Sequence, residues 1–577
     1  MGTKVNSNYE DLINFVRASS TNNTGAMALR PVSYGNELVD VANTASSWTA
    51  YGTNTIAQNG DAVEITYVNS GNGAYEFLTE THGLSQDLEA GKIYQITAEV
   101  KVNQGNVYLE LRHASSTYES VLISTTDYQK VIFNIVVTDV DSVFLKQTGM
   151  GTGEVFSIKN ISVKEVLFDQ PNGTLTLFPH PENVPRVEYD ADGNRLGLLV
   201  EEQRINEFTY SEAFNESNWQ RPNDSYAAST LPFTEQSPTK VANSAATLID
   251  NSSGGVGGVY IRSLANGLAT STPHTFSVFA KKDQLSYLAL ETKFFSVPTA
   301  TVYFDLDAGT VGTATNCTGA IQEYPDGWYR CSLTFTTDAS DGSGYGNIFV
   351  AEGDGDKTVD RDGTSSIFIF GAQFEEGSFP TSYIKNEGTA GGLTRSADLA
   401  RIPVADFGYN QSKGTVLVEA KATGDDSSFP RFVSFQDDPS NRWEIIGDTA
   451  LDVRFFHRFN AVTDVNGDLI TDVLNGKTSL KVAYAKAEND AAGVANAGSV
   501  VTDTNNGQLT QVVYLYIGAG SGGTSDLLNG HIKSIKYYPR RLTNAQLQAL
   551  TEPRSTPTLS LTFDGQESSY KENYIHG

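Results

Sequence analysis

The stretch GKIYQITAEVKVNQGNVYLELRH (91–113) sets the fold class. Within it, YQITAEVKV (94–102) and NVYLELRH (106–113) alternate apolar and polar residues, with a turn-forming segment between them. Period-2 alternation is the pattern of a strand with one buried face, and two such runs joined by a short turn predict an antiparallel pair. The pattern recurs at TVYFDLDA (301–308) and GTVLVEAKA (414–422). We therefore predict an all-β protein made of antiparallel β-sandwiches.

Helical periodicity is clear in only one short segment, LTNAQLQALT (542–551). Thr543 is suited to cap the N-terminus, and Gln546 three residues later completes the spacing of a capping box. Leu547 and Leu550 supply an apolar face. Heptads, collagen triplets and short solenoid repeats are absent from the sequence, so no fibrous shaft of these kinds is expected. The sequence predicts one short C-terminal helix.

Length and internal similarity predict the number of domains. A chain of 577 residues corresponds to roughly three or four domains. Two stretches share an order of features: each opens with a tryptophan, Trp48 or Trp219, and continues through paired strands. They close with VFSIKNISVKEV (155–166) and SIFIFGAQFEEG (366–377). We interpret them as divergent copies of one jelly roll, followed by a third sandwich.

Charge and composition exclude several functions. Asp and Glu number 68 and Lys and Arg number 40, which gives a formal net charge of −28. A surface this acidic repels phosphate backbones, so no nucleic-acid partner is expected. Apolar runs stay well below the ~20 residues of a membrane span, so no membrane insertion is expected. The first twenty residues lack an apolar signal core, so Sec secretion is not predicted.

The two cysteines, Cys317 and Cys331, lie on the two arms of a predicted hairpin that turns at PDG (325–327). Counting from that turn places Cys331 opposite residue 321, so the two thiols do not face each other. We expect free thiols, which fits assembly in a reducing cytoplasm.

Three segments carry a resemblance to a known family. The segment NVPRVEYDADGNRLGLLVEEQRINEFTYSEAFNESNW (183–219) resembles a signature of tailed-bacteriophage virion proteins, although Ile205 stands where threonine is usual. In that signature, a Gly-Leu-Leu-x-Glu-x-x-Arg-x-Asn element leads into a jelly roll like a carbohydrate-binding module. The segment GAQFEEGSFPTSYIKNEGTAGGLTRSADLARI (371–402) is similar to the closing part of the same architecture. The unit 414–551 resembles a concanavalin A-like, laminin-G-like domain.

The resemblance also bears on domain order. In such proteins a Phe-x-Arg-Ala-Ser strand lies close in sequence to the Val-Pro-Arg element, whereas here FVRASS (15–20) and NVPR (183–186) are far apart. We infer that the first jelly roll was inserted between them, and we predict that FVRASS packs beside the connector 184–205. The expected order is an N-terminal strand or arm (1–37), a first jelly roll (38–167), a connector packing with the arm (168–207), a second jelly roll (208–386), a linker (387–413), a concanavalin A-like sandwich (414–551) and a tail (552–577) that pairs with a neighbouring subunit or virion protein.

The resemblance implies a non-enzymatic virion protein, made in the host cytoplasm, that serves as a tail-fibre or head-fibre component. It would bind host-surface glycans and contact other virion proteins. A homo-oligomer is implied, and a trimer is the common state of fibres. Two alternatives remain open: a capsid or tail decoration protein that binds no sugar, and a polysaccharide depolymerase.

A depolymerase would need two carboxyl groups facing one substrate. Glu201 and Glu202 are adjacent in sequence, as are Glu375 and Glu376. On a strand, neighbours point to opposite faces, so neither pair can act together. Nucleophile elbows, phosphate-binding loops and Rossmann glycine patterns are absent from the sequence. We therefore expect no enzyme activity.

Tryptophans with polar neighbours are the first candidates for sugar binding, since an indole covers the apolar face of a pyranose. Trp328, which begins an amphipathic strand after a turn, is expected in the core instead. Core packing is the alternative for the others as well. The candidate carbohydrate-binding residues are Trp48, Trp219, Trp443, Asn441 and Arg442.

An acidic, glycine-rich loop, EGDGDKTVDRDG (352–363), is the candidate cation site. Ca²⁺ takes six to eight oxygen ligands, but the spacing departs from an EF-hand and no Glu holds the twelfth position. The candidate ligands of a structural Ca²⁺ are Asp354, Asp356, Asp360 and Asp362, with a solvated turn as the alternative. DADGN (190–194) and DVNGD (464–468) look similar but are predicted to be hairpin turns.

Overall fold

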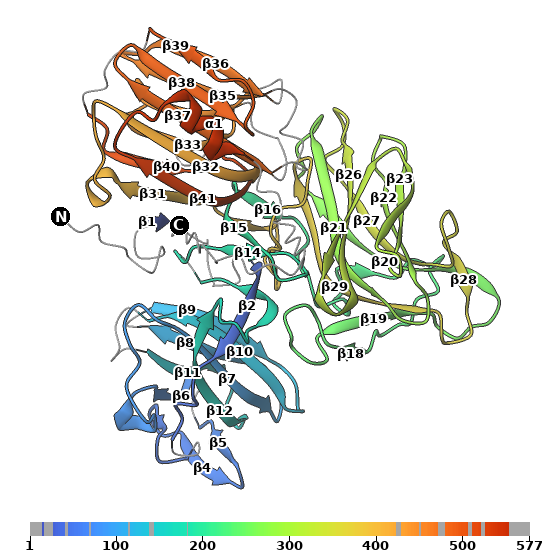
Figure 1. Ribbon diagram of the computed structural model, residues 1–577. Helices are drawn as coiled ribbons and strands as arrows, with labels where there is room; N and C mark the ends of the chain where they lie inside the picture. The colour runs from blue at the N-terminus through green and yellow to red at the C-terminus, as the bar shows by residue number, and fades with distance from the viewer. Residues whose placement is uncertain are drawn as a thin grey trace, which may run out of the picture.

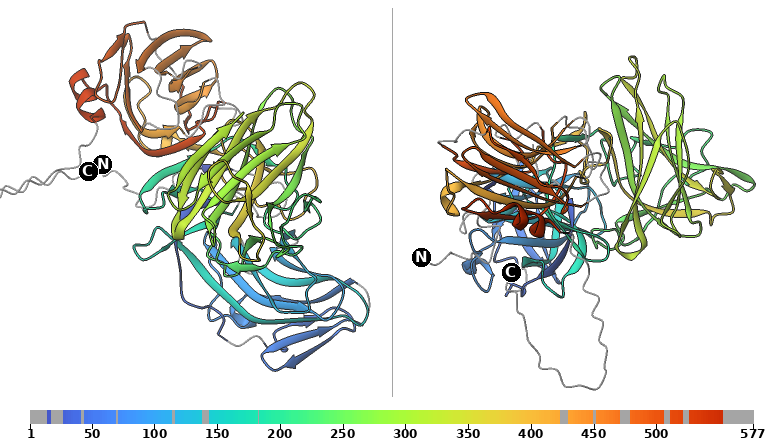
Figure 2. Two further views of the ribbon diagram at one scale, coloured as in Figure 1. Left: turned by 90° about the vertical axis from the view of Figure 1, so that its right-hand side faces the viewer. Right: turned by 45° about the horizontal axis from the view of Figure 1, so that its top comes forward.

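The protein consists of three β-lobes that meet at a common centre (Figure 1), and the views in Figure 2 separate the same lobes. Sheets dominate the described part of the chain, with one α-helix, α1 (Asn544–Thr551), which confirms the predicted all-β class. No helix in this part has the length and apolar character to span a membrane. The computed structural model describes residues 14–16, 27–40, 44–68, 71–113, 116–137, 143–181, 183–422, 429–448, 452–470, 479–505, 511–520 and 526–552.

The first jelly roll packs two antiparallel sheets face to face. In β7 (Ile93–Val102) every second side chain is buried, as the alternation predicts. The predicted pairing of β7 with β8 (Val107–His113) is wrong, because the turn between them crosses from one sheet to the other. One sheet has the order β3 (Thr49–Ala50), β6 (Gly71–Phe77), β11 (Val143–Met150), β8 (Val107–His113), β9 (Ser116–Ile123). The other has the order β10 (Gln129–Val136), β7 (Ile93–Val102), β12 (Val155–Phe168), β2 (Met27–Tyr34), β13 (Thr174–Pro179), with β5 (Ala62–Thr66) between β12 and β4 (Thr55–Asn59).

The second jelly roll repeats this topology and adds one edge strand to each sheet, β24 (Thr310–Thr315) and β25 (Thr318–Tyr324). One sheet has the order β17 (Trp219–Gln220), β20 (Val256–Asn266), β27 (Ser343–Ala351), β22 (Tyr287–Lys293), β23 (Ala300–Asp305), β24 (Thr310–Thr315), with β28 (Thr358–Asp360) beside β20. The other has the order β18 (Phe233–Glu235), β19 (Ala245–Ile249), β29 (Ser366–Glu376), β21 (Pro273–Lys282), β26 (Trp328–Thr336), β25 (Thr318–Tyr324). Strands β17, β20, β27, β22 and β23 occupy the places of β3, β6, β11, β8 and β9.

The third sandwich takes strands from distant parts of the chain. One sheet has the order β1 (Asn14–Val16), β31 (Leu399–Pro403), β40 (Tyr514–Ile517), β33 (Arg431–Asp438), β34 (Asn441–Gly447), β35 (Val453–Phe459), β36 (Val462–Ile470). The other has the order β14 (Val187–Tyr189), β15 (Arg195–Val200), β41 (Gly530–Tyr538), β32 (Gly414–Ala422), β37 (Leu480–Ala487), β38 (Asp490–Ala495), β39 (Val501–Asp503). The connector and linker thus supply strands to this lobe.

The C-terminal helix lies on the outside of the third sandwich. Its capping box forms as predicted: Thr543 accepts from the Gln546 backbone, and the Gln546 side chain accepts from the Thr543 backbone. Leu547 is fully buried in a small apolar cluster with side chains of β37 and β38. Residues 553–577, to which the tail prediction refers, lie outside the described residues.

Only the first two residues of FVRASS lie in the described part of the chain, so its predicted packing beside the connector 184–205 stays a prediction. Phe15 pairs with Ala400 of β31, not with a strand of the connector 184–205, and residues 17–20 are outside the described part. The connector nevertheless lies beside the start of β31, because the backbone N–H of Asp398, the residue before that strand, donates to the Glu201 carbonyl at 2.9 Å. The N-terminal strand and the connector therefore belong to one lobe.

Two of the turn predictions are confirmed and one is wrong. DADGN (190–194) joins β14 to β15, and the hairpin at 325–327 places Cys331 opposite Ile321. The segment DVNGD (464–468), however, lies inside β36. The turn comes earlier, at positions 460 and 461, where both residues have positive φ. A Cβ on Gly467 would lie 2.3 Å from the Phe455 ring, so this glycine makes room for an aromatic side chain.

A buried ionic cluster lies where the lobes meet. Arg186 is fully buried and donates to Glu201 at 2.8 Å and to Asp398. The Ser382 backbone N–H also donates to Glu201, at 2.8 Å, and Arg395 lies 3.6 Å from the same carboxylate. Burial alone would raise the pKa of Glu201, but the charges of Arg395 and Arg186 outweigh it and hold that pKa well below its ordinary value. We call these five residues the junction cluster.

The junction cluster explains the motifs of the resemblance in physical terms. Its members come from NVPR, GLLVEEQR, PTSYI and TRSAD, which are the segments that carry the resemblance. A second contact joins the two jelly rolls: Met27 and Leu177 of the first jelly roll pack with Phe279, Trp328 and Tyr383 in one apolar cluster. The distinctive motifs therefore hold lobes together.

Candidate functional site

The second jelly roll has an outward sheet face that combines aromatic and polar side chains. Inward residues of its strands form the core, and outward residues line up in rows across β20, β27, β22 and β23. The aromatic row reads Tyr260, Phe349, Ala289 and Tyr303, and its side chains are buried beneath the polar groups of this face. The polar row beside it reads Gln220, Arg262, Asn347, Glu291 and Thr301. We call this surface the row face.

The polar row is held by hydrogen bonds and one ion pair. The Glu291 carboxylate accepts from Asn347 at 3.0 Å and from Thr301 at 3.3 Å, and it pairs with Lys357. Arg262 donates to Gln220 at 3.2 Å and stacks over the Tyr345 ring at 4.1 Å. These contacts fix the charged groups in place before any ligand arrives, which lowers the entropy cost of binding.

A depression of about 430 Å³ opens on the row face. Tyr260, Glu291, Lys293 and Lys357 line it, together with Asp224. The Tyr260 hydroxyl donates to Asp224 at 2.6 Å, and this bond lowers the pKa of the Asp224 carboxyl. The Tyr260 and Phe349 rings stack at 4.3 Å beneath the charged groups. The depression thus offers donors, acceptors and an aromatic floor, as small-molecule sites commonly do.

Phe294 stands out beside the depression. Its side chain is 62% exposed, and its backbone has φ 67, in the left-handed region that bulky residues avoid. Its ring lies 5.7 Å from Tyr345, and the Arg262 guanidinium lies 5.4 Å from its centroid. A strained, exposed aromatic residue at the edge of a site supports a functional role.

The first jelly roll presents a similar face on the equivalent sheet. One row reads Phe77, Phe144 and Arg112, and the next reads Tyr75, Lys146 and Glu110. The Tyr51 ring lies 5.1 Å from Tyr75, and the Lys146 ammonium lies 5.5 Å from the Tyr51 centroid. Both copies of the repeat therefore keep aromatic and charged side chains on the same outer surface.

The predicted tryptophan platforms are core residues. Trp48, Trp219 and Trp443 are 4%, 2% and 0% exposed, so no sugar ring can stack on them in this structure. Trp219 donates to the Tyr210 carbonyl at 2.7 Å, and Trp443 stacks on Phe435 at 4.1 Å. Their proposed role as sugar platforms is corrected on this ground. Trp328, expected in the core, is 1% exposed.

The polar neighbours of Trp443 serve local structure. Arg442 donates to Glu444 at 2.9 Å, and Asn441 accepts from the Asn460 backbone at 3.0 Å. These bonds tie β34 to the turn between β35 and β36. The structure therefore does not assemble Asn441 and Arg442 into a site with Trp443.

The four aspartates proposed for calcium do not converge. Among the described residues, no group of three or more His, Cys, Asp or Glu side chains is placed to hold a metal ion. Asp360 is exposed on β28, and the other three each accept a backbone N–H of a threonine at 2.7 to 2.9 Å: Asp354 from Thr313, Asp356 from Thr358 and Asp362 from Thr364. Calcium binding here stays a prediction, which a calcium titration of the thermal unfolding temperature checks.

The adjacent glutamates point apart, as expected. Glu201 and Glu375 are buried, whereas Glu376 is exposed and Glu202 is half-buried. Glu375 accepts from Thr381 at 3.0 Å. Neither pair faces a common space.

The row face was missed at the level of sequence, although a signal exists. In YLALETKFF (287–295) the leucines mark the buried face, so Tyr287, Glu291 and Lys293 share the outer one. Aromatic and charged residues together on a solvent face are a cue for binding. Which strands bring such residues side by side is set by the sheet order, which one strand alone does not reveal.

Comparisons with known proteins give only distant likenesses. No protein-family model matches the sequence, and no curated protein matches it. A carbohydrate-binding module of the Ruminococcus gnavus IT-sialidase, bound to alpha2,3 sialyllactose, is 17% identical over 25% of this chain and 84% of that one, with a TM-score of 0.22. The tandem carbohydrate-binding modules of Paenibacillus barcinonensis Xyn10C are 12% identical over 62% and 100%, with a TM-score of 0.18.

A third solved structure, the LG1-3 region of the laminin alpha2 chain, is 8% identical over 80% of this chain and 95% of that one, with a TM-score of 0.19. The solved structures that this chain resembles thus include carbohydrate-binding modules and a laminin G region. Likeness at these scores says nothing about what this chain binds.

Proposed function

We propose that the protein binds glycans without cleaving them, and that the row face of the second jelly roll is its main binding surface. The observation that carries the proposal is the depression with its prearranged polar groups above an aromatic floor, with the exposed Phe294 ring at its edge. Phe294 is exposed enough to pack against the apolar face of a sugar, and the polar side chains around the depression bind the hydroxyls. The buried aromatic row forms the floor beneath them.

The equivalent face of the first jelly roll supports a second, weaker contact. Two such faces on one chain, multiplied by several chains, would raise avidity without a tighter single site. A homo-oligomer, and specifically a trimer, remains part of the proposal on the resemblance alone.

A binding role is favoured over a polysaccharide depolymerase. A general acid needs a raised pKa, whereas the Tyr260 hydroxyl lowers the pKa of Asp224. The other carboxylate in the depression, Glu291, is paired with Lys357. Release of reducing ends from a host polysaccharide would contradict this part of the proposal.

The place of the protein is also proposed, on sequence resemblance: a tail-fibre or head-fibre component of a tailed-bacteriophage virion, in contact with other virion proteins. Mass spectrometry and immunogold labelling of purified particles test it. A protein absent from the particle would contradict a virion role.

A glycan array probed with the purified full chain, with and without chelator, tests glycan binding. Titration calorimetry on the best ligand then compares variants. Phe294→Ala and Arg262→Ala should each weaken binding at least tenfold, because they remove the accessible ring and the stacked guanidinium. Val462→Ala is the matched control, since Val462 is an exposed apolar residue on the third sandwich. Unchanged affinity in both row-face variants, or an empty array, would favour a decoration role.

A further inference from the structure

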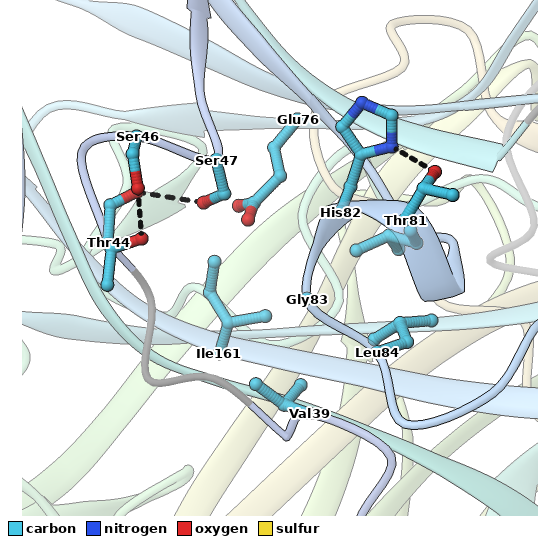
Figure 3. Close-up of a pocket in the computed structure, with 11 residues that line it drawn as sticks. Val39, Thr44, Ser46, Ser47, Glu76, Thr81, His82, Gly83, Leu84 and Ile161 are labelled. Carbon is cyan, nitrogen blue, oxygen red and sulfur yellow. Dashed lines mark hydrogen bonds between the residues drawn. The ribbon is translucent and has the colours of Figure 1, made fainter.

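A partly enclosed pocket of about 240 Å³ lies in the first jelly roll, apart from its outward face. Figure 3 shows polar side chains on one side of it, among them Ser46, Ser47, Glu76 and His82. Aliphatic side chains form the opposite wall: Val39, Leu84 and Ile161. The pocket is therefore two-sided, with hydrogen-bonding groups facing hydrocarbon.

Glu76 is the acidic group of this pocket. It points inward from β6, between the outward-facing Tyr75 and Phe77, and is 6% exposed. Its Oε2 atom has no hydrogen-bond partner among the described residues, and burial raises the pKa of the carboxyl to about 7 despite a bond with Ser47. Among the described residues that line the pocket, none is a lysine or an arginine. The carboxyl is thus buried without a lysine or arginine partner from the described pocket wall, which is costly whenever it ionises.

The fold itself does not require an acid at this place. Thr49 pairs with Tyr75, which sets Trp48 across from Glu76. In the second jelly roll, Trp219 pairs with Ser263 at the equivalent place. The equivalent buried tryptophan of the second jelly roll thus lies across from an uncharged residue, so the acid at Glu76 is particular to the first jelly roll.

We propose that this pocket binds the free amino group of a small amino sugar, with Glu76 as its counter-ion. An ammonium group supplies the charge that the pocket wall lacks, and the serine hydroxyls accept its remaining N–H bonds. The aliphatic wall packs against the C–H face of the sugar ring. The chain's net charge of −28 draws cationic ligands towards it.

A divalent cation fits the pocket less well. Ca²⁺ prefers six to eight oxygens with several carboxylates, whereas this pocket offers a single carboxyl group. The inference goes beyond the proposed function, since it concerns another site and selects a positive charge rather than sugar hydroxyls alone.

Titration calorimetry of the full chain with glucosamine tests the proposal. Glucose and N-acetylglucosamine serve as neutral analogues, and calcium chloride as the metal probe. Glucosamine should bind at least tenfold more tightly than either analogue. Glu76→Gln keeps the shape of the side chain and removes its charge, so it should weaken glucosamine binding at least tenfold.

Glu80→Gln is the matched control, because Glu80 is an exposed acid on the neighbouring turn and should stay within twofold of wild type. Ser46→Phe, at an exposed position on the rim, should block binding without altering the core. Any glucosamine binding that Phe294→Ala removes is assigned to the row face, and only the binding that Glu76→Gln removes is assigned to the pocket. Equal binding of glucose, calcium binding that depends on Glu76, or no loss in Glu76→Gln would overturn the proposal.

Discussion

At the scale of single residues, Phe294 shows how stability and binding oppose each other. A left-handed backbone at a non-glycine residue costs on the order of 1–2 kcal/mol. The Phe294 side chain is mostly exposed, so burial of its ring offsets little of this free-energy cost. The conformation aims the ring at Tyr345 and Arg262, beside the depression.

Phe294→Asn should therefore raise the free energy of unfolding of the second jelly roll, by about 0.5–1 kcal/mol, since asparagine tolerates positive φ. Urea denaturation followed by tryptophan fluorescence measures it. Glycan affinity should fall in the same variant. A loss of stability would show that the ring contacts outweigh the strain.

Glu76 makes a pH-dependent contribution to stability. Its pKa is about 7 in the folded protein, against an ordinary value of 4.5 for a glutamate side chain. The folded state therefore holds a proton that the unfolded state loses first, so this contribution is fully present below pH 4.5 and is lost as pH rises through 7. The shift corresponds to about 3 kcal/mol.

We expect wild type to lose roughly this free energy of unfolding between pH 4.5 and 8, relative to Glu76→Gln. Denaturant unfolding of both proteins at several pH values, without added ligand, checks it. If the free energies of unfolding of the two proteins changed with pH in the same way, the raised pKa of Glu76 would be contradicted.

At the scale of elements, alternation in sequence located the strands well. The segments 94–102 and 414–422 become β7 and β32 almost to the residue, because each has one buried face. The prediction of a turn at DVNGD was wrong because Gly467 makes room for the Phe455 ring of the neighbouring strand. Local sequence does not encode this contact between strands. Turn chemistry and close packing both select glycine.

The helix offers a clean element-scale test. Thr543→Ala removes the side-chain acceptor for the Gln546 backbone N–H and should cost about 1 kcal/mol in unfolding of the third sandwich. Thr543→Ser keeps the hydroxyl and should stay near wild type. Thermal and urea unfolding compare the three proteins, and equal stability of the alanine variant would show that the cap is dispensable.

At the scale of the whole molecule, the junction cluster decides how the lobes are joined. Arg186→Met leaves the buried carboxylates of Glu201 and Asp398 without their shared cation, which should cost about 3–5 kcal/mol. Denaturation and limited proteolysis should show earlier separation of lobes. Arg195→Met is the control, because Arg195 is exposed on the neighbouring strand. Similar behaviour of both variants would mean that apolar contacts alone hold the junction.

Prediction from sequence reached its limit at this scale. Local patterns gave the all-β class, the helix cap and the Cys331 register, because neighbours in sequence determine them. The pairing of β15 with β41 joins residues more than three hundred positions apart, and the row face depends on such sheet order. The tryptophans were assigned by residue type, but burial decides their role, and that too is set by distant strands.

The third sandwich also has a consequence for synthesis. Its strand β15 ends at Val200, yet its partner β41 begins at Gly530. At about 5–20 residues per second on the ribosome, the early strand waits on the order of tens of seconds for that partner. Both jelly rolls are synthesised before β41, so the third sandwich is the last lobe to fold. A nascent chain that stalls before β41 leaves the edge of β15 unpaired, and an unpaired strand edge is prone to aggregation.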